Sequence, residues 1–346
     1  MKKTKEKYLD SIQVYRGLAA LFVVIHHNAA SIRYYHDFDS SILNFAGQIG
    51  KYGVDFFFVL SGFIISYTSI SKVNEKGTLG KYIKNRFLRI YVPYLPIGVF
   101  VYLIYMFLPS ISNANREISA LTSFTLIPHG KPALSVAWTL TFELLFYIFY
   151  SLRFFSKNVF RFSLFLWVTL IILVNLFAPE TTTDNGALYQ LITSTYNIEF
   201  LLGVLLSYAY IKRIKINFNL NIFALLTLGI SFLYVVGYEV KFFDFLPNII
   251  FSLFVLFMMY FTVTHKKISI KSKNLFMIIG NASYSIYLVH NSIQALFVRF
   301  FPKIHIELRV VLIILVSLIG SCIIGYIYSY VFENRLTYLL KRKLNV

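Results

Sequence analysis

The sequence predicts an all-α protein, a polytopic membrane helix bundle with about ten transmembrane helices and both termini in the cytoplasm. Of its 346 residues, 58% are hydrophobic and 14% are charged. Apolar stretches of about 20 residues, the length a helix needs to cross a bilayer, recur from Leu18 to the last residues. We expect one membrane-embedded domain over residues 1–346, with short cytoplasmic tails at 1–11 and 331–346.

Each expected span is an apolar run that ends in polar or basic residues. The ten expected spans cover residues 12–30, 53–71, 88–108, 136–155, 160–178, 190–211, 220–238, 244–263, 275–300 and 308–330. Polar residues interrupt the fourth and the ninth. The longest expected outer loop, residues 109–135, is where we expect a large external acceptor to be met.

The distribution of basic residues predicts the orientation. With the N-terminus in the cytoplasm, 24 of the 33 lysines and arginines fall on the cytoplasmic side, 8 fall in outer loops, and Arg16 lies inside the first span. Short cytoplasmic loops of membrane proteins carry such an excess. Both termini are therefore expected inside, in a multi-pass protein of the plasma or inner membrane.

Charge and cysteine content exclude other classes of protein. The net charge of +18 comes from these loops, so nucleic acid is not an expected partner. The single cysteine, Cys322, lies in a late apolar span and can form neither a disulfide framework nor a thiolate metal site. We expect no metal.

The first span, "RGLAALFVVIHHN", contains Arg16 and the histidines His26 and His27. Arg16 and His27 are eleven residues apart, so on a helix they share one face and lie about 16 Å apart along the axis. Ionisable groups inside a bilayer are costly and usually functional. The alternative is that Arg16 snorkels to the headgroups and His27 is a hydrogen-bonded interhelical residue.

Two further blocks carry polar side chains. "GVDFFFVLSGF" in the second span contains Asp55, Ser61 and two glycines that allow close helix packing. "KYIKNRFLRIYVPY" places Arg86 and Arg89 on one helical face at the cytoplasmic end, a pair that suits phosphate oxygens. Simple packing of Asp55 and a positive-inside anchor at the arginines are the alternatives.

The fourth and ninth spans each bury an ionisable residue. "WTLTFELLFY" places Glu143 about 9 Å below the outer surface, and "SYSIYLVHN" places His290 roughly 22 Å above the cytoplasmic one, as deep as His27. In a core about 30 Å thick these three residues share one level. A common site in the outer half is predicted, with three independent polar contacts as the alternative.

Five blocks together resemble the acyltransferase-3 family of integral membrane acyltransferases. They are "IQVYRGLAALFVVIHHN", "GVDFFFVLSGFIIS", "RFLRIYVPY", "WTLTFELLFY" and "SYSIYLVH", in this order. The first two blocks most resemble the branch that O-acetylates exopolysaccharides and O-antigens of lipopolysaccharide. The resemblance runs from about Ile12 to His290. Some relatives carry an additional extracytoplasmic domain that completes transfer, and we recognise none in this sequence.

The resemblance assigns roles to single residues. The arginine and histidine of the family's first signature fall on Arg16 and His27, so His27 inherits the catalytic role and His26 is expected to pack. The family's arginine pair falls on Arg86 and Arg89, which implies donor contacts. Glu143 matches the acid of the family's tryptophan-to-glutamate block, and the family's serine-tyrosine-serine block falls on Ser283 to Ser285 ahead of His290. Together with the polar residues of the second span, the candidates for supporting or substrate-binding roles are Asp55, Ser61, Trp138, Ser283, Tyr284 and His290.

The predicted function is transfer of an acyl group from cytoplasmic acyl-CoA to a hydroxyl of a cell-surface or exported polysaccharide. The acyl group is expected to be acetyl. His27 acts as general base, or as a nucleophile that carries the acetyl group, while Glu143 and Arg16 orient the groups or stabilise the site. The expected partners are acyl-CoA, a polysaccharide or lipid-linked glycan, the bilayer and glycan-assembly proteins. The alternative is a polysaccharide or small-solute transporter with a buried polar path.

Overall fold

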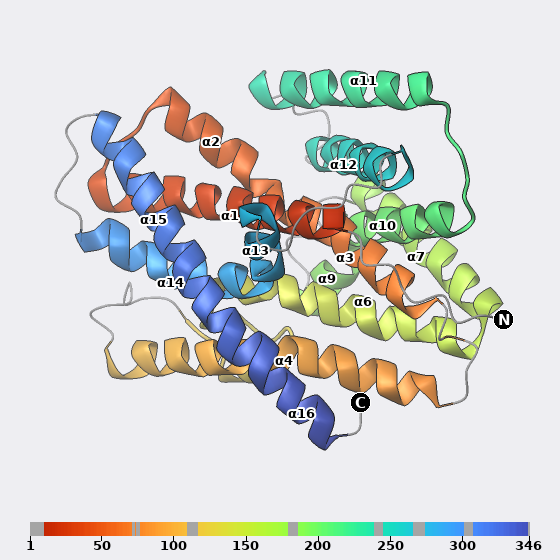
Figure 1. Cartoon of the computed structure of the whole chain (residues 1–346), viewed down its shortest axis with the longest axis horizontal. Coiled ribbons are helices and arrows are strands. Elements are labelled where there is room, and N and C mark those ends of the chain that lie inside the picture. Colours follow the sequence, from red (N-terminus) through yellow and green to blue (C-terminus); the bar gives the residue numbers. More distant parts are fainter. Residues whose placement is uncertain are drawn as a thin grey trace. The chain divides into compact units, whose positions relative to one another are not determined.

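The computed structural model describes residues 10–70, 73, 77–108, 117–178, 186–238, 245–265, 274–300 and 307–344. Within these ranges the chain is helical and contains no strand, which confirms the predicted all-α class. The longer helices are α1 (Asp10–His36), α2 (Ser41–Lys51), α3 (Gly53–Ser69), α4 (Thr78–Phe107), α6 (Trp138–Phe155), α7 (Lys157–Phe177), α10 (Tyr196–Ile211), α11 (Phe218–Gly237), α12 (Leu246–His265), α14 (Ser283–Phe300) and α15 (Glu307–Tyr328) (Figure 1). Shorter ones are α5 (Ala120–Thr125), η1 (Ser135–Ala137), α9 (Ala187–Thr193), α13 (Leu275–Asn281), η2 (Ser329–Leu336) and α16 (Thr337–Lys343).

Eight helical segments in the described ranges are long and apolar enough to cross a membrane. The first and ninth expected spans fall on α1 and on α13 with α14, which are not among the eight. Arg16 and two histidines make α1 more polar, and serines, an asparagine and His290 do the same for α14. The number ten and the cytoplasmic position of both termini stay predictions, and residues 1–9 and 345–346 lie outside the described part.

The structure divides two of the expected spans. The ninth, 275–300, is two helices that meet at Ala282, and the sixth, 190–211, is formed by α9 and α10 with a short break between them. The expected tail after residue 330 is helical through Lys343, and its first part, η2, is a π-helix. Isolated polar positions within an apolar run do not reveal such breaks, because hydropathy measures composition rather than backbone geometry.

The contacts of the chain gather in two compact units, and each is described separately here. The first unit contains Met1–Ile70, Ile198–Ser283 and Gln294–Cys322, and the second contains Ser71–Asn197, Tyr284–Ile293 and Ile323–Val346. The single-domain prediction is not tested by this division. Each predicted site residue belongs to one of these two units.

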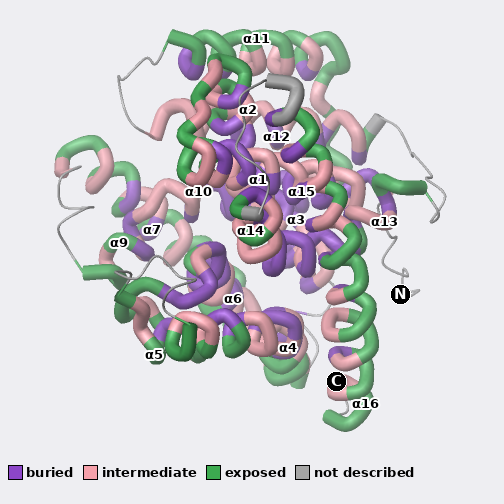
Figure 2. The backbone as a smooth tube through the Cα atoms, turned by 90° about the vertical axis from the view of Figure 1, so that its left-hand side faces the viewer, coloured by how far each residue is buried: buried purple, intermediate pink, exposed green. Residues whose placement is uncertain are grey.

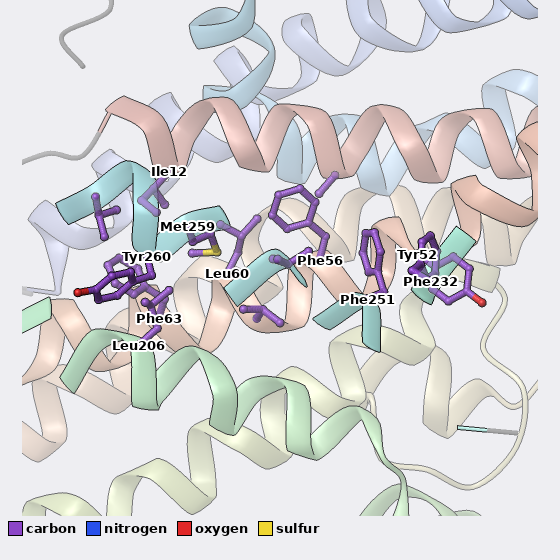
Figure 3. Packing of buried hydrophobic residues seen from close by; sticks show 14 of the residues in the cluster. Ile12, Tyr52, Phe56, Leu60, Phe63, Leu206, Phe232, Phe251, Met259 and Tyr260 are labelled. Carbon is purple, nitrogen blue, oxygen red and sulfur yellow. The ribbon is translucent and has the colours of Figure 1, made fainter. Parts of the chain in front are cut away.

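In the first unit, α1 packs against α2, α3 and α13, and α12 packs against α3 and α11. Aromatic and aliphatic side chains of α3, α10, α11 and α12 form its core, and Figure 3 shows Phe56, Leu60 and Phe63 of α3 within it. Eleven residues of α1 are buried, whereas α11 is mostly exposed (Figure 2). The exposed side chains of α11 are large and apolar, as expected of a helix that faces lipid.

Glycines permit close contact between α3 and its neighbours, as the sequence predicts. A Cβ atom on Gly62 would lie 1.9 Å from the carbonyl oxygen of Phe200 in α10, and one on Gly53 would lie 2.6 Å from the carbonyl oxygen of Ala19 in α1. Backbones at this distance leave no space for a side chain.

We therefore expect Gly62→Ala to force α3 and α10 apart and to lower the free energy of unfolding by about 1–3 kcal/mol, the usual cost of overpacking. Thermal unfolding of the detergent-solubilised protein measures the change. Gly80→Ala on α4 is the control, because a Cβ atom there would meet nothing within 4 Å. An equal melting temperature for both variants would contradict the close contact.

In the second unit, α4 packs against α5, α6, η2 and α16, and α7 packs against α6 and α9. Pro93 and Pro96 lie inside α4 and remove backbone donors from its hydrogen-bond ladder. The Tyr284 hydroxyl donates to the carbonyl of Ile90 at 3.2 Å, and the Tyr328 hydroxyl donates to that of Pro93 at 2.7 Å. These bonds tie α4 to α14 and α15 beside the arginine pair.

Candidate active site

Antiparallel packing of α4 and α6 in the second unit brings charged and aromatic side chains together. The Tyr82 hydroxyl donates to the carbonyl of Tyr147 at 3.3 Å. One turn further along α4, the guanidinium of Arg86 lies over the rings of Tyr82 and Tyr147, 5.6 and 5.3 Å from their centroids. Such cation–π contacts hold a guanidinium in place.

Glu143 lies on the same face of α6 as Tyr147, four residues earlier. The Tyr147 hydroxyl donates to its Oε1 atom. Arg89 of α4 is close enough to interact electrostatically with Glu143 and Tyr147, and also with Glu333 of η2. The half-buried Arg89 side chain thus interacts with two acidic residues from different helices.

The structure corrects the predicted separation of these groups. The arginine pair was expected at the cytoplasmic end and Glu143 in the outer half, but Arg89 and Glu143 belong to one cluster. The reason is that α4 begins at Thr78, ten residues before the expected span, because Lys81 and Lys84 were interpreted as loop residues. Arg86 and Arg89 lie about 12 and about 17 Å along α4 from its first residue.

The C-terminal helices complete this cluster with two residues that the sequence analysis missed. Glu333 accepts hydrogen bonds from the hydroxyls of Ser285 at 2.8 Å and Ser329 at 3.1 Å. Lys341 of α16 is close enough to Arg86 and Arg89 for their like charges to interact. We call Arg86, Arg89, Glu143, Glu333 and Lys341 the charged cluster.

His290 lies in α14, and its side chain is fully buried. Its Nδ1 atom donates to the carbonyl of Tyr287 at 2.7 Å, so Nε2 is the nitrogen that can accept a proton. The Tyr287 hydroxyl is 2.8 Å from Thr139 Oγ1 and lies within the electrostatic reach of Glu143. Tyr287 therefore stands between His290 and Glu143 in the second unit.

The two histidines of α1 in the first unit have different surroundings. His26 Nδ1 donates to the carbonyl of Gly47 in α2 at 2.7 Å, which agrees with the packing role predicted for it. The ring of the half-buried His27 contacts that of His26 edge-on, with centroids 5.1 Å apart. Because α1 is uninterrupted from Asp10 to His36, Arg16 and His27 do share one helical face.

The Arg16 side chain is only 9% exposed, and its Nη1 atom donates to Gln13 Oε1 at 3.0 Å. Beside it, α13 approaches α1 so closely that a Cβ atom on Gly280 would lie 2.0 Å from the carbonyl oxygen of Gln13. Arg16 is therefore held within the first unit at the contact of α1 and α13.

Asp55 of α3 belongs to a second buried acidic pair in the first unit. Asn248 Nδ2 donates to Asp55 Oδ1 at 2.5 Å, and the carboxyl of the fully buried Glu199 is within hydrogen-bonding reach of Asp55. Glu199 was missed, although a lone acid in the apolar run "YNIEFLLGVLL" is a visible signal. Asp55 and Glu199 thus form a buried acidic pair between α3 and α10, with Lys51 within electrostatic reach of Asp55.

The remaining predicted residues are distributed over both units. Ser61 of α3 is half-buried and Ser283 is fully buried in the first unit, whereas Tyr284 and the exposed Trp138 belong to the second. His27 lies in the first unit, whereas Glu143 and His290 lie in the second. That the three residues share one depth in the membrane therefore stays a prediction. Among the described residues, no group of three or more histidine, cysteine or acidic side chains could hold a metal ion.

Apolar helices of spanning length and clusters of ionisable side chains buried among them define the class, a multi-pass membrane protein with an internal polar site. The family model of the acyltransferase domain known as acyltransferase-3 matches residues 9–327. The chain belongs to this family and is a membrane acyltransferase. The matched range contains every predicted site residue and favours the acyltransferase over the transporter. Comparison with curated proteins and with solved structures found no match.

Proposed function

We propose that the protein transfers an acetyl group from cytoplasmic acetyl-CoA to a hydroxyl of a cell-surface or exported polysaccharide, at the plasma or inner membrane. The observation that carries the proposal is the charged cluster, in which three cationic side chains gather beside Glu143 in a chain of this family. The acceptor is a polysaccharide or a lipid-linked glycan, and glycan-assembly proteins are its suppliers.

The donor half of the proposal rests on Arg86, Arg89 and Lys341. Two arginines three residues apart present guanidinium groups on one face, and these groups match the oxygens of a phosphate or diphosphate. Glu143 and Glu333 balance only two of the three positive charges, so the charged cluster favours an anion. In the proposed reaction this anion is the nucleotide portion of acetyl-CoA.

The chemical step that we propose uses His27 as general base. Its imidazole takes the proton of an acceptor hydroxyl while the hydroxyl oxygen attacks the carbonyl carbon of the thioester. The new C–O bond forms, the C–S bond breaks, and the CoA thiolate leaves with the proton that His27 held. His27 is chosen on the family signature and because His26 is bound to the Gly47 carbonyl.

Glu143 and Arg16 have supporting roles in this proposal. Glu143 holds Tyr147 by a hydrogen bond and interacts with Arg89, so it links the donor site to α6. Arg16 shares a helical face with His27 and provides a fixed positive charge on it. Asp55, Ser61 and Ser283 support the helices of the first unit.

The donor site predicts a specific kinetic defect. We expect Arg86→Ala to raise the KM for acetyl-CoA about tenfold or more and to change kcat little, because a charged hydrogen bond to phosphate contributes about 1.5–3 kcal/mol. Transfer of labelled acetyl from acetyl-CoA to alkali-labile esters of the acceptor, measured in proteoliposomes, gives both constants.

Two controls make this result specific. Arg153→Ala removes an arginine from the last turn of α6, away from the charged cluster, and should leave the KM unchanged. Acetyl-pantetheine, which lacks the nucleotide phosphates, should be used equally well by the wild type and by Arg86→Ala. If the variant weakens the use of both donors alike, Arg86 does not bind phosphate. If the wild type forms no acetyl ester, the proposed function is wrong.

A further inference from the structure

A cavity of about 420 Å³ lies in the second unit, within the size range of small-molecule sites. It lies between the segment that precedes α6, the first turns of α6, and the corner between α9 and α10. The thirteen described residues that line it include no charged side chain. They are Thr122, Pro128, Gly130, Pro132, Trp138, Thr141, Phe142, Asn175, Ala187, Gln190, Leu191, Ser194 and Thr195.

One wall of the cavity is aromatic. Trp138 is 37% exposed, and its ring packs against Phe142 and Tyr196 with centroids 5.8 and 5.4 Å away. The rings of Phe142 and Tyr196 are themselves 5.6 Å apart. The indole is thus held by contacts with two neighbouring rings. A fixed, accessible aromatic face is suited to the C–H groups of a flat ring.

Gln190, Ser194 and Thr195 form a polar part of the lining, and buried donors fix their backbone. The Trp167 indole donates to the carbonyl of Ile192 at 2.8 Å, and Asn175 donates to that of Thr193 at 2.8 Å. Asn197 donates to the carbonyls of Leu191 at 2.8 Å and Ser194 at 3.0 Å. The corner that carries Gln190, Ser194 and Thr195 is therefore ordered before any ligand binds, which lowers the entropic cost of binding.

The segment before α6 is held in a similar way. The Tyr94 hydroxyl donates to the carbonyl of Ser123 at 2.6 Å, and the amide of Ala133 donates to Ser123 Oγ at 2.9 Å. The amide of His129 donates to Thr122 Oγ1 at 3.1 Å. This segment belongs to the loop predicted on the outer side, 109–135, of which residues 109–116 lie outside the described part.

We propose that this cavity binds a neutral sugar ring of the acceptor, stacked on Trp138 with its hydroxyls toward Gln190, Ser194 and Thr195. A pyranose has C–H groups on its faces and hydroxyls at its edge, which matches a cavity lined by both aromatic and polar side chains. Because no lining residue is charged, an acidic sugar would lose hydration without gaining a countercharge. The inference rests on the proposed function and adds the acceptor subsite and its preference for neutral units.

The position of the cavity on α6 fits this role. Trp138, Thr141 and Phe142 line the cavity, and Glu143 of the charged cluster is the next residue. Glu143 lies about 7.5 Å along the helix axis from Trp138. A glycan bound at the cavity is thus held by the same rigid helix that carries Glu143.

Binding can be tested without catalysis. Oligosaccharides released from the host's own surface polysaccharide are separated into a neutral and an acidic pool and titrated against the purified protein, with tryptophan fluorescence as the readout. The chain has two tryptophans, of which Trp138 faces the cavity. We expect the neutral pool to bind, and Trp138→Ala to weaken its binding about threefold to tenfold, whereas Trp138→Phe retains most of it. Because these variants lack the Trp138 fluorescence, their affinity for the neutral pool is measured by displacement of a labelled neutral oligosaccharide.

The matched control is Phe155→Ala, which removes a 73% exposed aromatic ring from the other end of α6 and should not change binding. Tighter binding of the acidic pool, no binding of the neutral pool, or equal binding by Trp138→Ala and the wild type would each overturn the inference. If Trp138→Ala does not fold, Gln190→Ala is tested in its place. Equal binding of the neutral pool by Gln190→Ala and the wild type would then overturn the inference. Binding of neutral sugars by a wild type that transfers no acetyl would instead refute the proposed function and leave this site in place.

Discussion

Replacing His27 with alanine is expected to lower ester-linked acetate on the surface polysaccharide at least about a hundredfold, with normal amounts of protein in the membrane. The loss follows from the proposed role of the imidazole, because a positioned general base contributes about a hundredfold to ten-thousandfold to rate. Release of acetate by mild alkali from polysaccharide of the native host measures the effect.

The neighbouring histidine provides the control for this experiment. His26→Ala removes the hydrogen bond to the Gly47 carbonyl and should cost about 0.5–1.5 kcal/mol of stability while acetylation continues. Unchanged acetate in His27→Ala with normal protein levels would exclude the proposed mechanism. Loss in both variants with normal folding would mean that the pair, rather than His27 alone, serves the reaction.

The same variant separates direct transfer from a relay through an acetyl-histidine. In the relay, His27 attacks the thioester, CoA leaves, and the acetyl group stays on the imidazole until the hydroxyl arrives. Incubation of the wild type with labelled acetyl-CoA and no acceptor would then label the protein, and His27→Ala would remain unlabelled. A requirement for both substrates before any CoA is released favours direct transfer.

Replacing Arg89 with glutamine is expected to affect stability and donor binding together. The change leaves Glu143 and Glu333 without the cation that lies near both. Because Arg89 is only half-buried, we expect a loss of about 3 kcal/mol, the lower end of the cost of breaking a buried charge pair. The KM for acetyl-CoA should rise about tenfold or more. Thermal unfolding in detergent and steady-state kinetics measure the two effects.

A second substitution separates these effects. Adding Glu333→Gln to Arg89→Gln removes one of the two uncompensated carboxylates and should restore most of the stability, while the KM for acetyl-CoA stays high. Recovery of a normal KM in the double variant would show that Arg89 acts only as a structural countercharge. An unaltered melting temperature in Arg89→Gln would contradict its interaction with the two acids.

The sequence predicted those parts of the site that lie within single helices. Arg16, His27 and Glu143 stand out because each is an ionisable residue in an apolar run. The glycines of "GVDFFFVLSGF" predict close packing between helices. The structure bears out the helical class and the contacts of Gly53 and Gly62. Local spacing is sufficient for such features because they depend on the helical period alone.

The parts that the sequence did not predict depend on packing between distant segments. Lys341 and Glu333 join Arg89 from more than two hundred residues away, and no local pattern identifies them. The cavity is built from the start of α6, residues 122–132 and residues 187–195, and hydrogen bonds of Trp167, Asn175 and Asn197 fix the corner between α9 and α10. Glu199 was visible as an acid in an apolar run and Asp55 was predicted, but their contact between α3 and α10 was not.

The π-helical segment Ser329–Leu336 sets the direction of the side chains that follow it. Its hydrogen bonds span five residues instead of four, so it winds more slowly than an α-helix, and the residues after it are rotated about the helix axis. Lys341 of α16 therefore lies on another side of the helix than a continuous α-helix would give it. The π-helical segment thus decides which C-terminal side chain reaches Arg86 and Arg89.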